Sequence, residues 1–182
     1  GKQLADVRYH ASCGGRTADR SIIFPGTAPS ASRTCEPCQE RAERESFAGA
    51  PADKRPLGWI LELGFGPLAN LGHSLGLGTN GLDFLPAALD GGGRWLEVRV
   101  SGTAKDKRMS LEQLRAIVGH SVLKSGMLSD VRVTPAGLLI TGRGRGHGVG
   151  LCQEGTRDYA QRGWDSATIL RHYYPAMRLH RL

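Results

Sequence analysis

The sequence has few aromatic residues and no long apolar run. Phe, Trp and Tyr make up 6% of its 182 residues, so the aromatic platforms on which nucleic-acid bases stack are scarce. No stretch approaches the roughly 20 consecutive apolar residues that a transmembrane helix needs. The first residues, GKQL, do not follow a secretory signal pattern. We therefore expect a soluble globular protein whose export signal or anchor, where one exists, lies outside this chain.

Acidic residues are also fewer than basic ones. There are 17 Asp and Glu against 24 Lys and Arg, giving a net charge of +7. This excess favours an acidic partner, which could be nucleic acid, anionic lipid or an acidic cell-wall polymer. The basic residues are dispersed and form no lysine-rich tail. A basic module for nucleic acid is therefore the least favoured function, and we expect no nucleic-acid partner.

Nucleotide-binding and hydrolytic zinc motifs are both missing. The segment Gly142–Gly155 reads GRGRGHGVGLCQEG, but no Lys-Ser/Thr pair follows its glycines and no H-E-x-x-H occurs in the chain. Alternating glycines mark a backbone that turns tightly or lets a group approach closely. With Leu139 and Ile140 leading in as a strand, we expect His147 to lie at a strand-to-helix corner suited to a ligand site. The alternative is a loop that serves only the close packing of its neighbours.

The four cysteines are few but are grouped. His10 and Cys13 form one x-x-spaced pair, and Cys35 and Cys38 form another. A two-residue spacer lets both side chains reach one ion, and four nitrogen and sulfur ligands suit tetrahedral Zn²⁺. The sequence therefore predicts a structural zinc knuckle. A disulfide between two of the cysteines in an exported protein, with His10 unrelated, is the alternative.

Cys152 lies far from these pairs, just after the glycine loop. Its position is typical of a small buried apolar residue, or of a reactive thiol close to a helix N-terminus.

The hydrophobic pattern predicts an α+β fold, with a β-rich mixed core, a few short helices and a zinc-knuckle-like N-terminal segment. Residues 4–9 alternate as a strand with Ala5, Val7 and Tyr9 on a half-buried face. The glycine clusters at 64–81 and 91–93 predict loops or tight turns, and charged residues 41–55 predict a surface segment. The remaining expected strands are 59–63, 95–100, 128–133 and 138–141, the last two forming a hairpin. The expected helices begin at Ser110 with a capping box, cover 153–161, and run from an Asp165 N-cap to His172.

Several of these segments resemble one family when they are taken together and in order. The stretch VRYHASCGGRTA, then LRAIVG, the loop GRGRGHGVGLCQEG and the helix ending ILRHYYP look like the SpoIID/LytB family of stage II sporulation protein D and amidase enhancers. The motifs span about residues 6–179. The resemblance implies a single SpoIID-like domain over 1–182, with a strand and metal knuckle in 1–48 and the core with the histidine loop in 49–182.

The resemblance implies an exported cell-wall protein, located in the cell envelope or secreted, that acts on peptidoglycan. Sporulation members are lytic transglycosylases that cut peptide-free glycan strands, and LytB-type members enhance a cell-wall amidase. Zinc held by His and Cys is known in the family, and His10 and Cys13 match its zinc-binding segment. We predict that Arg143, Arg145, His147, Gln153 and Tyr173 line a glycan cleft, although Tyr173 could instead pack against Trp164.

Cleavage of a glycosidic bond needs a carboxylic acid that protonates the leaving oxygen. Family members carry this glutamate N-terminal to the tyrosine-histidine-serine segment, and we expect that part of the family's domain to be missing from this chain. Glu154 is a weak substitute candidate, and a solvated surface role is the alternative. The leading interpretation is the substrate-side portion of a lytic transglycosylase. The alternative is a noncatalytic wall-binding or amidase-enhancing module, so the sequence leaves open whether the chain is an enzyme.

Overall fold

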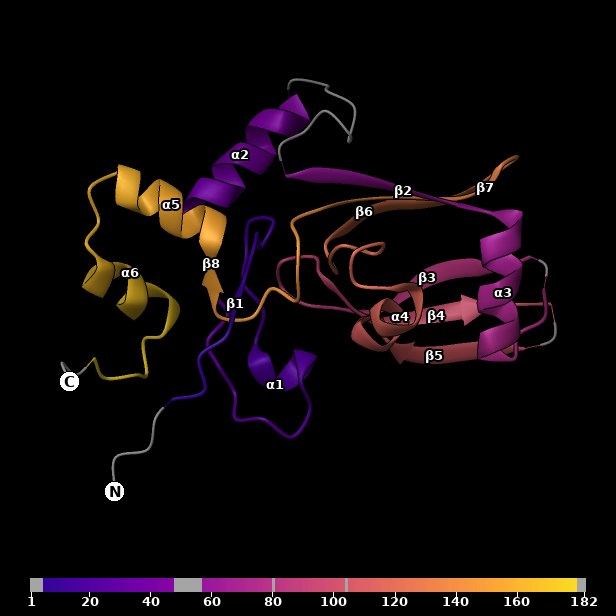
Figure 1. Ribbon diagram of the computed structural model, residues 1–182, viewed down its shortest axis with the longest axis horizontal. Helices are drawn as coiled ribbons and strands as arrows, with labels where there is room; N and C mark the ends of the chain where they lie inside the picture. The colour runs from indigo at the N-terminus through magenta and orange to yellow at the C-terminus, as the bar shows by residue number, and fades with distance from the viewer. Residues whose placement is uncertain (1–4, 48–56, 80, 104, 180–182) are drawn as a thin grey trace. The chain divides into compact units, whose positions relative to one another are not determined.

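The computed structural model describes residues 5–47, 57–79, 81–103 and 105–179 (Figure 1). The chain forms two compact units. Unit 1 joins residues 1–48 to 145–182, and unit 2 comprises residues 49–144. The described residues form six helices and eight strands in three small sheets, which confirms the α+β prediction. The prediction of a single SpoIID-like domain stays a prediction.

Unit 2 contains two three-stranded antiparallel sheets. The first has the order β2-β7-β6, formed by Gly58–Gly64, Gly137–Arg143 and Leu128–Thr134. The second has the order β3-β4-β5, formed by Asp83–Leu89, Trp95–Ser101 and Asp106–Ser110. The predicted 128–141 hairpin is confirmed as β6 and β7.

The apolar core of unit 2 comes from both sheets and from helices α3 (Phe65–Leu75) and α4 (Leu111–Val118). Helix α3 packs against β2 and β7, and α4 packs against β4 and β5. The capping box of α4 is confirmed, since the Ser110 hydroxyl accepts from the Gln113 N–H and the Gln113 side chain accepts from the Ser110 N–H. These contacts satisfy N–H groups that the first helical turn leaves without a partner.

The prediction of loops or tight turns over the whole of 64–81 is wrong, because α3 lies inside that range. Leu68, Leu71 and Leu75 fall on one buried face of the helix, a spacing that the frequent glycines obscured. A Cβ at Gly72 would come 2.0 Å from the carbonyl oxygen of Gly78. Glycine at this position thus permits close packing rather than a turn.

Unit 1 holds a short parallel pair, β1 (Tyr9–His10) with β8 (Leu151–Cys152), and four helices. The helices are α1 (Arg20–Ile23), α2 (Glu36–Phe47), α5 (Gln153–Gln161) and α6 (Ser166–Tyr173). Helix α5 packs against α2, α6 and β8. The predicted helix over 153–161 and the Asp165 N-cap are confirmed, since the Asp165 carboxylate accepts from the Thr168 N–H.

One local expectation in unit 1 differs from the structure, and another falls on a helix. Ala5, Val7 and Tyr9 are exposed, whereas His10 on the opposite face is buried. The half-buried face predicted from their alternation is therefore wrong. The charged segment from residue 41 continues a helix that begins at Glu36, while residues 48–55 lie outside the described part. Among the α2 side chains that the structure describes, Pro37, Cys38 and Ala42 are buried, which is too little for a pattern-based assignment.

Candidate metal centre

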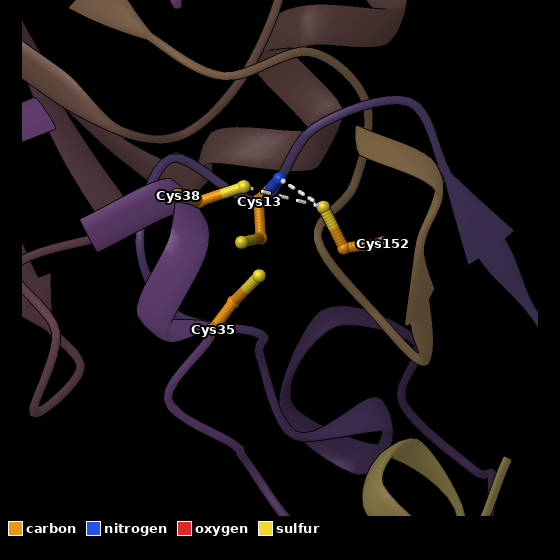
Figure 2. A group of neighbouring side chains, drawn as sticks. All are labelled: Cys13, Cys35, Cys38 and Cys152. Atoms are coloured by element: carbon orange, nitrogen blue, oxygen red, sulfur yellow. Dashed lines mark hydrogen bonds between the residues drawn. The ribbon is translucent and has the colours of Figure 1, made fainter. Parts of the chain in front are cut away.

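Four cysteine side chains converge in unit 1. The sulfur atoms of Cys13, Cys35, Cys38 and Cys152 all lie within 4.8 Å of one another, and all four residues are buried (Figure 2). They come from three separate segments: the loop after β1, the start of α2, and β8. The fold thus brings four thiols from distant parts of the chain into one cluster.

The spacing of the sulfurs suits a shared ion better than a disulfide. Cys38 Sγ and Cys152 Sγ lie 3.7 Å apart, whereas a disulfide requires about 2.05 Å. Four sulfurs placed tetrahedrally about 2.3 Å from zinc are separated by about 3.8 Å. All four cysteines are free thiols. The residues therefore fit a tetrathiolate site for a soft divalent metal such as Zn²⁺.

Two helix N-termini point at this cluster. Helix α2 begins directly after Cys35 and carries Cys38 in its first turn. Helix α5 begins directly after Cys152, whose sulfur accepts a hydrogen bond from the Gly155 N–H. The positive end of a helix dipole stabilises a thiolate, so both helices favour the ionised sulfurs that metal binding requires.

Further donors surround the sulfurs. The N–H of Cys13 donates to Cys152 Sγ at 3.3 Å, and the N–H of Gly15 donates to Cys13 Sγ at 3.4 Å. The Tyr173 hydroxyl lies 3.3 Å from Cys35 Sγ. Outer-shell hydrogen bonds of this kind orient metal ligands and spread their charge.

The thiols are tightly coupled in their ionisation. Hydrogen bonding with Cys13 lowers the pKa of Cys152, and the same contact raises the pKa of Cys13. Hydrogen bonding with Cys13 also lowers the pKa of Cys35, so the four thiols do not ionise independently. A bound divalent ion lowers the pKa of every coordinating thiol.

The four-thiol group differs from the predicted ligand set in one member. It contains the predicted Cys13, Cys35 and Cys38, together with Cys152 and not His10. His10 is paired in register with Cys152 on the neighbouring strand. Its Nδ1 lies 3.1 Å from the carbonyl oxygen of Val149, and its Nε2 is buried. After the larger contributions of the three other thiols, the His10 side chain also helps to lower the pKa of Cys152. A ligating imidazole commonly donates its second nitrogen to a carbonyl in this way, and the role of His10 as a ligand stays a prediction.

His147 lies beside His10, in the segment between β7 and β8 that leads into α5. The two rings meet edge to face with centroids 5.7 Å apart, and Phe24 contacts the His147 ring at 5.2 Å. Val149 positions both imidazoles, because its N–H donates to His147 Nδ1 and its carbonyl faces His10 Nδ1. A carbonyl can only accept, so Nδ1 of His10 carries a proton, whereas the neutral ring of His147 carries its proton on Nε2.

The glycines around His147 serve both turning and close approach. Gly144, Gly146, Gly148 and Gly150 all have positive φ. A Cβ at Gly150 would lie 2.0 Å from the Arg8 carbonyl oxygen. The loop is also tied to the N-terminal segment, since Ser12 and Arg145 exchange backbone hydrogen bonds. These glycines thus allow the loop to pack closely against the N-terminal segment, and the same loop carries His147.

The other predicted glycan-binding residues are distributed over the chain. Arg145 and Gln153 are exposed in unit 1, Gln153 as the first residue of α5. Arg143 ends β7 in unit 2. Tyr173 is 3% exposed, and its hydroxyl points at Cys35, so the structure places it beside the thiols.

Glu154, the weak acid candidate, takes part in ion pairs. Its carboxylate lies 3.2 Å from Arg41 and 2.5 Å from Arg157. Arg41 also pairs with Asp158. This network joins α2 to α5 next to the cysteine cluster, which indicates a structural contribution for Glu154.

Sequence reasoning missed three contributors to this region. Cys152 lacks a chelating neighbour in sequence, although its position after the loop and before a helix was a usable signal. Arg8 and Phe24 were not singled out, yet the Arg8 guanidinium lies over the Phe24 ring at 4.2 Å. No sequence motif joins these two residues to His147.

Comparison with known proteins gives short matches. No family model matches the chain. It is 36% identical over 67 residues to an amidase enhancer of Bacillus subtilis, covering 37% of this chain and 9% of that protein. It is 53% identical over 38 residues to an uncharacterized protein of Brachyspira hyodysenteriae, covering 21% of this chain and 10% of that protein. The chain thus spans about a tenth of the length of these relatives. No helix in the described ranges is long and apolar enough to cross a membrane.

Proposed function

We propose that this chain is a cell-envelope module that binds glycan strands of peptidoglycan, and that zinc bound by Cys13, Cys35, Cys38 and Cys152 holds its binding loop in place. The main support for this proposal is that the two segments richest in SpoIID/LytB-like residues meet in unit 1. Ser12 in the first segment pairs with Arg145 in the second, and β1 pairs with β8. The similarity of part of the chain to an amidase enhancer supports a cell-wall role.

The zinc has a structural role in this proposal. Four protein thiolates complete a tetrahedral coordination sphere, so no position remains for a reactive water. The centre links the loop after β1 to the N-termini of α2 and α5. The loop after β1 pairs with Arg145 of the His147 loop, α5 follows that loop in the chain, and α2 packs against α5.

Charge favours glycan strands that have lost their stem peptides. Each muramic acid of such a strand carries a free lactyl carboxylate beside the sugar ring, whereas an attached peptide turns this group into a neutral amide and holds its own carboxylates farther from the ring. Arg145 is exposed next to His147, and arginine binds carboxylates with two parallel hydrogen bonds. The net charge of +7 strengthens attraction to such a polyanion.

His147 is the proposed donor to sugar oxygens. Its Nδ1 accepts from the Val149 N–H, so the neutral ring carries its proton on Nε2, the atom proposed to donate to a sugar oxygen. Phe24 and His10 hold the ring on two sides, which reduces the entropy lost on binding. Gln153 and Arg145 complete the proposed contacts in unit 1.

A cell-wall amidase in the envelope is a further proposed partner of this chain.

Lytic transglycosylation is the second candidate, favoured by the resemblance of the histidine loop to that of SpoIID-like enzymes. The reaction protonates the glycosidic oxygen and lets the muramyl 6-hydroxyl attack the anomeric carbon, giving a 1,6-anhydro end. Glu154 is the candidate acid on this chain. Its ion pairs with Arg41 and Arg157 weigh against it, so we place binding before cleavage.

One experiment tests both functions. The protein is incubated with peptide-free glycan strands, with peptide-bearing strands and with uncharged chitin oligosaccharides of equal length. Binding is measured by sedimentation, and the strands are analysed by mass spectrometry. We expect salt-sensitive binding that is strongest for peptide-free strands, with the strands recovered intact. New anhydro ends would support transglycosylation instead.

His147→Ala should weaken this binding about tenfold, the equivalent of one hydrogen bond of about 1.4 kcal/mol. His73→Ala is the matched control, since His73 is an exposed histidine on α3 of unit 2. Equal binding by the wild type and by His147→Ala would refute the assignment of His147. Failure of the wild type to distinguish peptide-free glycan from chitin would refute the carboxylate-based recognition.

A further inference from the structure

Tyr173 is the one predicted glycan-cleft residue that the structure buries among the thiols. It is 3% exposed, on the last turn of α6, and its hydroxyl lies 3.3 Å from Cys35 Sγ. A sulfur that binds a metal is a thiolate and can only accept a hydrogen bond. The contact is therefore a donation from the Tyr173 hydroxyl to Cys35.

This donor differs in kind from those at Cys13 and Cys152. The hydrogen bonds to Cys13 and Cys152 come from the backbone N–H groups of Gly15, Cys13 and Gly155, which side-chain substitutions leave in place. The hydrogen bond at Cys35 comes from a side chain. Tyr173 is thus a position at which a side-chain substitution can remove a hydrogen bond to a sulfur of the centre.

The surroundings maintain this geometry. A Cβ at Gly155 would lie 2.3 Å from Cys35 Sγ and 2.5 Å from the Tyr173 hydroxyl oxygen, so the start of α5 leaves space for this contact. The Tyr173 ring meets the Tyr159 ring edge to face at 6.4 Å and the His172 ring at 4.8 Å. The hydroxyl is therefore directed by packing on more than one side.

We propose that Tyr173 is a positioning residue of the metal centre, whose hydroxyl donates to the Cys35 thiolate and thereby slows metal release and protects this sulfur from electrophiles. A hydrogen bond withdraws electron density from the thiolate, which lowers its nucleophilicity and offsets the net negative charge of four thiolates around one divalent ion. The inference rests on the metal binding proposed above.

The test uses the full chain loaded with Co²⁺, whose sulfur-to-metal charge-transfer band reports on the electron density of the sulfurs. Tyr173→Phe should shift this band to longer wavelength, weaken metal binding about tenfold, and accelerate alkylation of Cys35 by iodoacetamide. Tyr159→Phe is the matched control. Tyr159 belongs to the same buried aromatic cluster, but its hydroxyl donates to Glu36 and not to sulfur, so we expect the wild-type band position.

The outcomes separate the two proposals. A wild-type protein that binds no metal overturns the metal centre itself. A wild-type protein that binds one metal, with Tyr173→Phe unchanged in band position and affinity, overturns the role of Tyr173 alone. Where Tyr173→Phe does not fold, fluorotyrosine at position 173 keeps the shape and makes the hydroxyl a stronger donor. The band should then move to shorter wavelength, and an unmoved band contradicts the proposal.

Discussion

Cys152 and His10 show how neighbouring side chains can compete for one role. They are partners in the β1–β8 register, and Cys152 lies beside Cys13, Cys35 and Cys38. Cys152 belongs to the group of mutually close sulfurs, whereas His10 Nδ1 faces the Val149 carbonyl. The difference matters for metal selection, because four thiolates form a softer site than three thiolates and an imidazole.

Substitutions at these two positions should have unequal effects. We expect Cys152→Ser to weaken Zn²⁺ binding more than about 100-fold, beyond the usual cost of losing an outer-shell contact. His10→Ala should keep one ion per chain. Competition with a chromogenic chelator measures both. Loss of zinc in His10→Ala with retention in Cys152→Ser would assign the fourth ligand to His10 instead.

At the scale of elements, the first turn of α5 contributes more to the contacts of the metal centre than the apolar face of this helix does. Cys152 caps the helix, Glu154 pairs with Arg41 of α2, and Gly155 lies against Cys35 and Tyr173. Helix propensity alone would favour alanine at position 155, since glycine in a helix costs about 1 kcal/mol relative to alanine. The local contacts oppose this preference.

Gly155→Ala should therefore destabilise unit 1 and reduce its metal content, because the added Cβ would displace Cys35 Sγ or the Tyr173 hydroxyl. Gly66→Ala on α3 is the matched control, since no atom lies within 4 Å of a Cβ at that position. We expect it to stabilise unit 2 by up to about 1 kcal/mol. Urea unfolding and zinc content measure both variants, and a stabilised, zinc-replete Gly155→Ala would contradict the packing argument.

At the scale of the whole molecule, the two units are stabilised by different means. The apolar cluster of buried residues lies entirely in unit 2. The buried apolar residues of unit 1 are few, and four of them are the cysteines. Small units with little apolar burial commonly depend on a metal for their stability.

Removal of the metal should therefore destabilise unit 1 and leave unit 2 folded. We expect a strong chelator to abolish amide-exchange protection in unit 1 and to leave β2–β7 of unit 2 protected. Acid should have the same effect, because protons compete with the metal for the thiolates and affinity falls as pH falls. Hydrogen exchange read by mass spectrometry distinguishes the units. Equal loss in both units, or no loss in either, would count against a metal-dependent unit 1.

Much of the local structure follows from short-range patterns. The capping box at Ser110, the N-cap at Asp165, and the hairpin of β6 and β7 depend on residues a few positions apart, so the sequence contains their full cause. The x-x spacing of Cys35 and Cys38 likewise indicated a chelating pair. Helix α3 was missed because Gly72 permits a close approach of the Gly78 carbonyl, a contact that lies outside the helix.

The amino-acid sequence alone determined the α+β class, the approximate bounds of seven of the fourteen described elements, the cysteine pair and the placement of His147 at a corner, since each rests on neighbours in the chain. The addition of Cys152 to the thiols, the direction of the Tyr173 hydroxyl and the contact of His147 with Phe24 arose only in the folded molecule. Each joins segments more than 100 residues apart. Their meeting depends on the pairing of β1 with β8 and on the packing of α5 against α2, which no local pattern specifies.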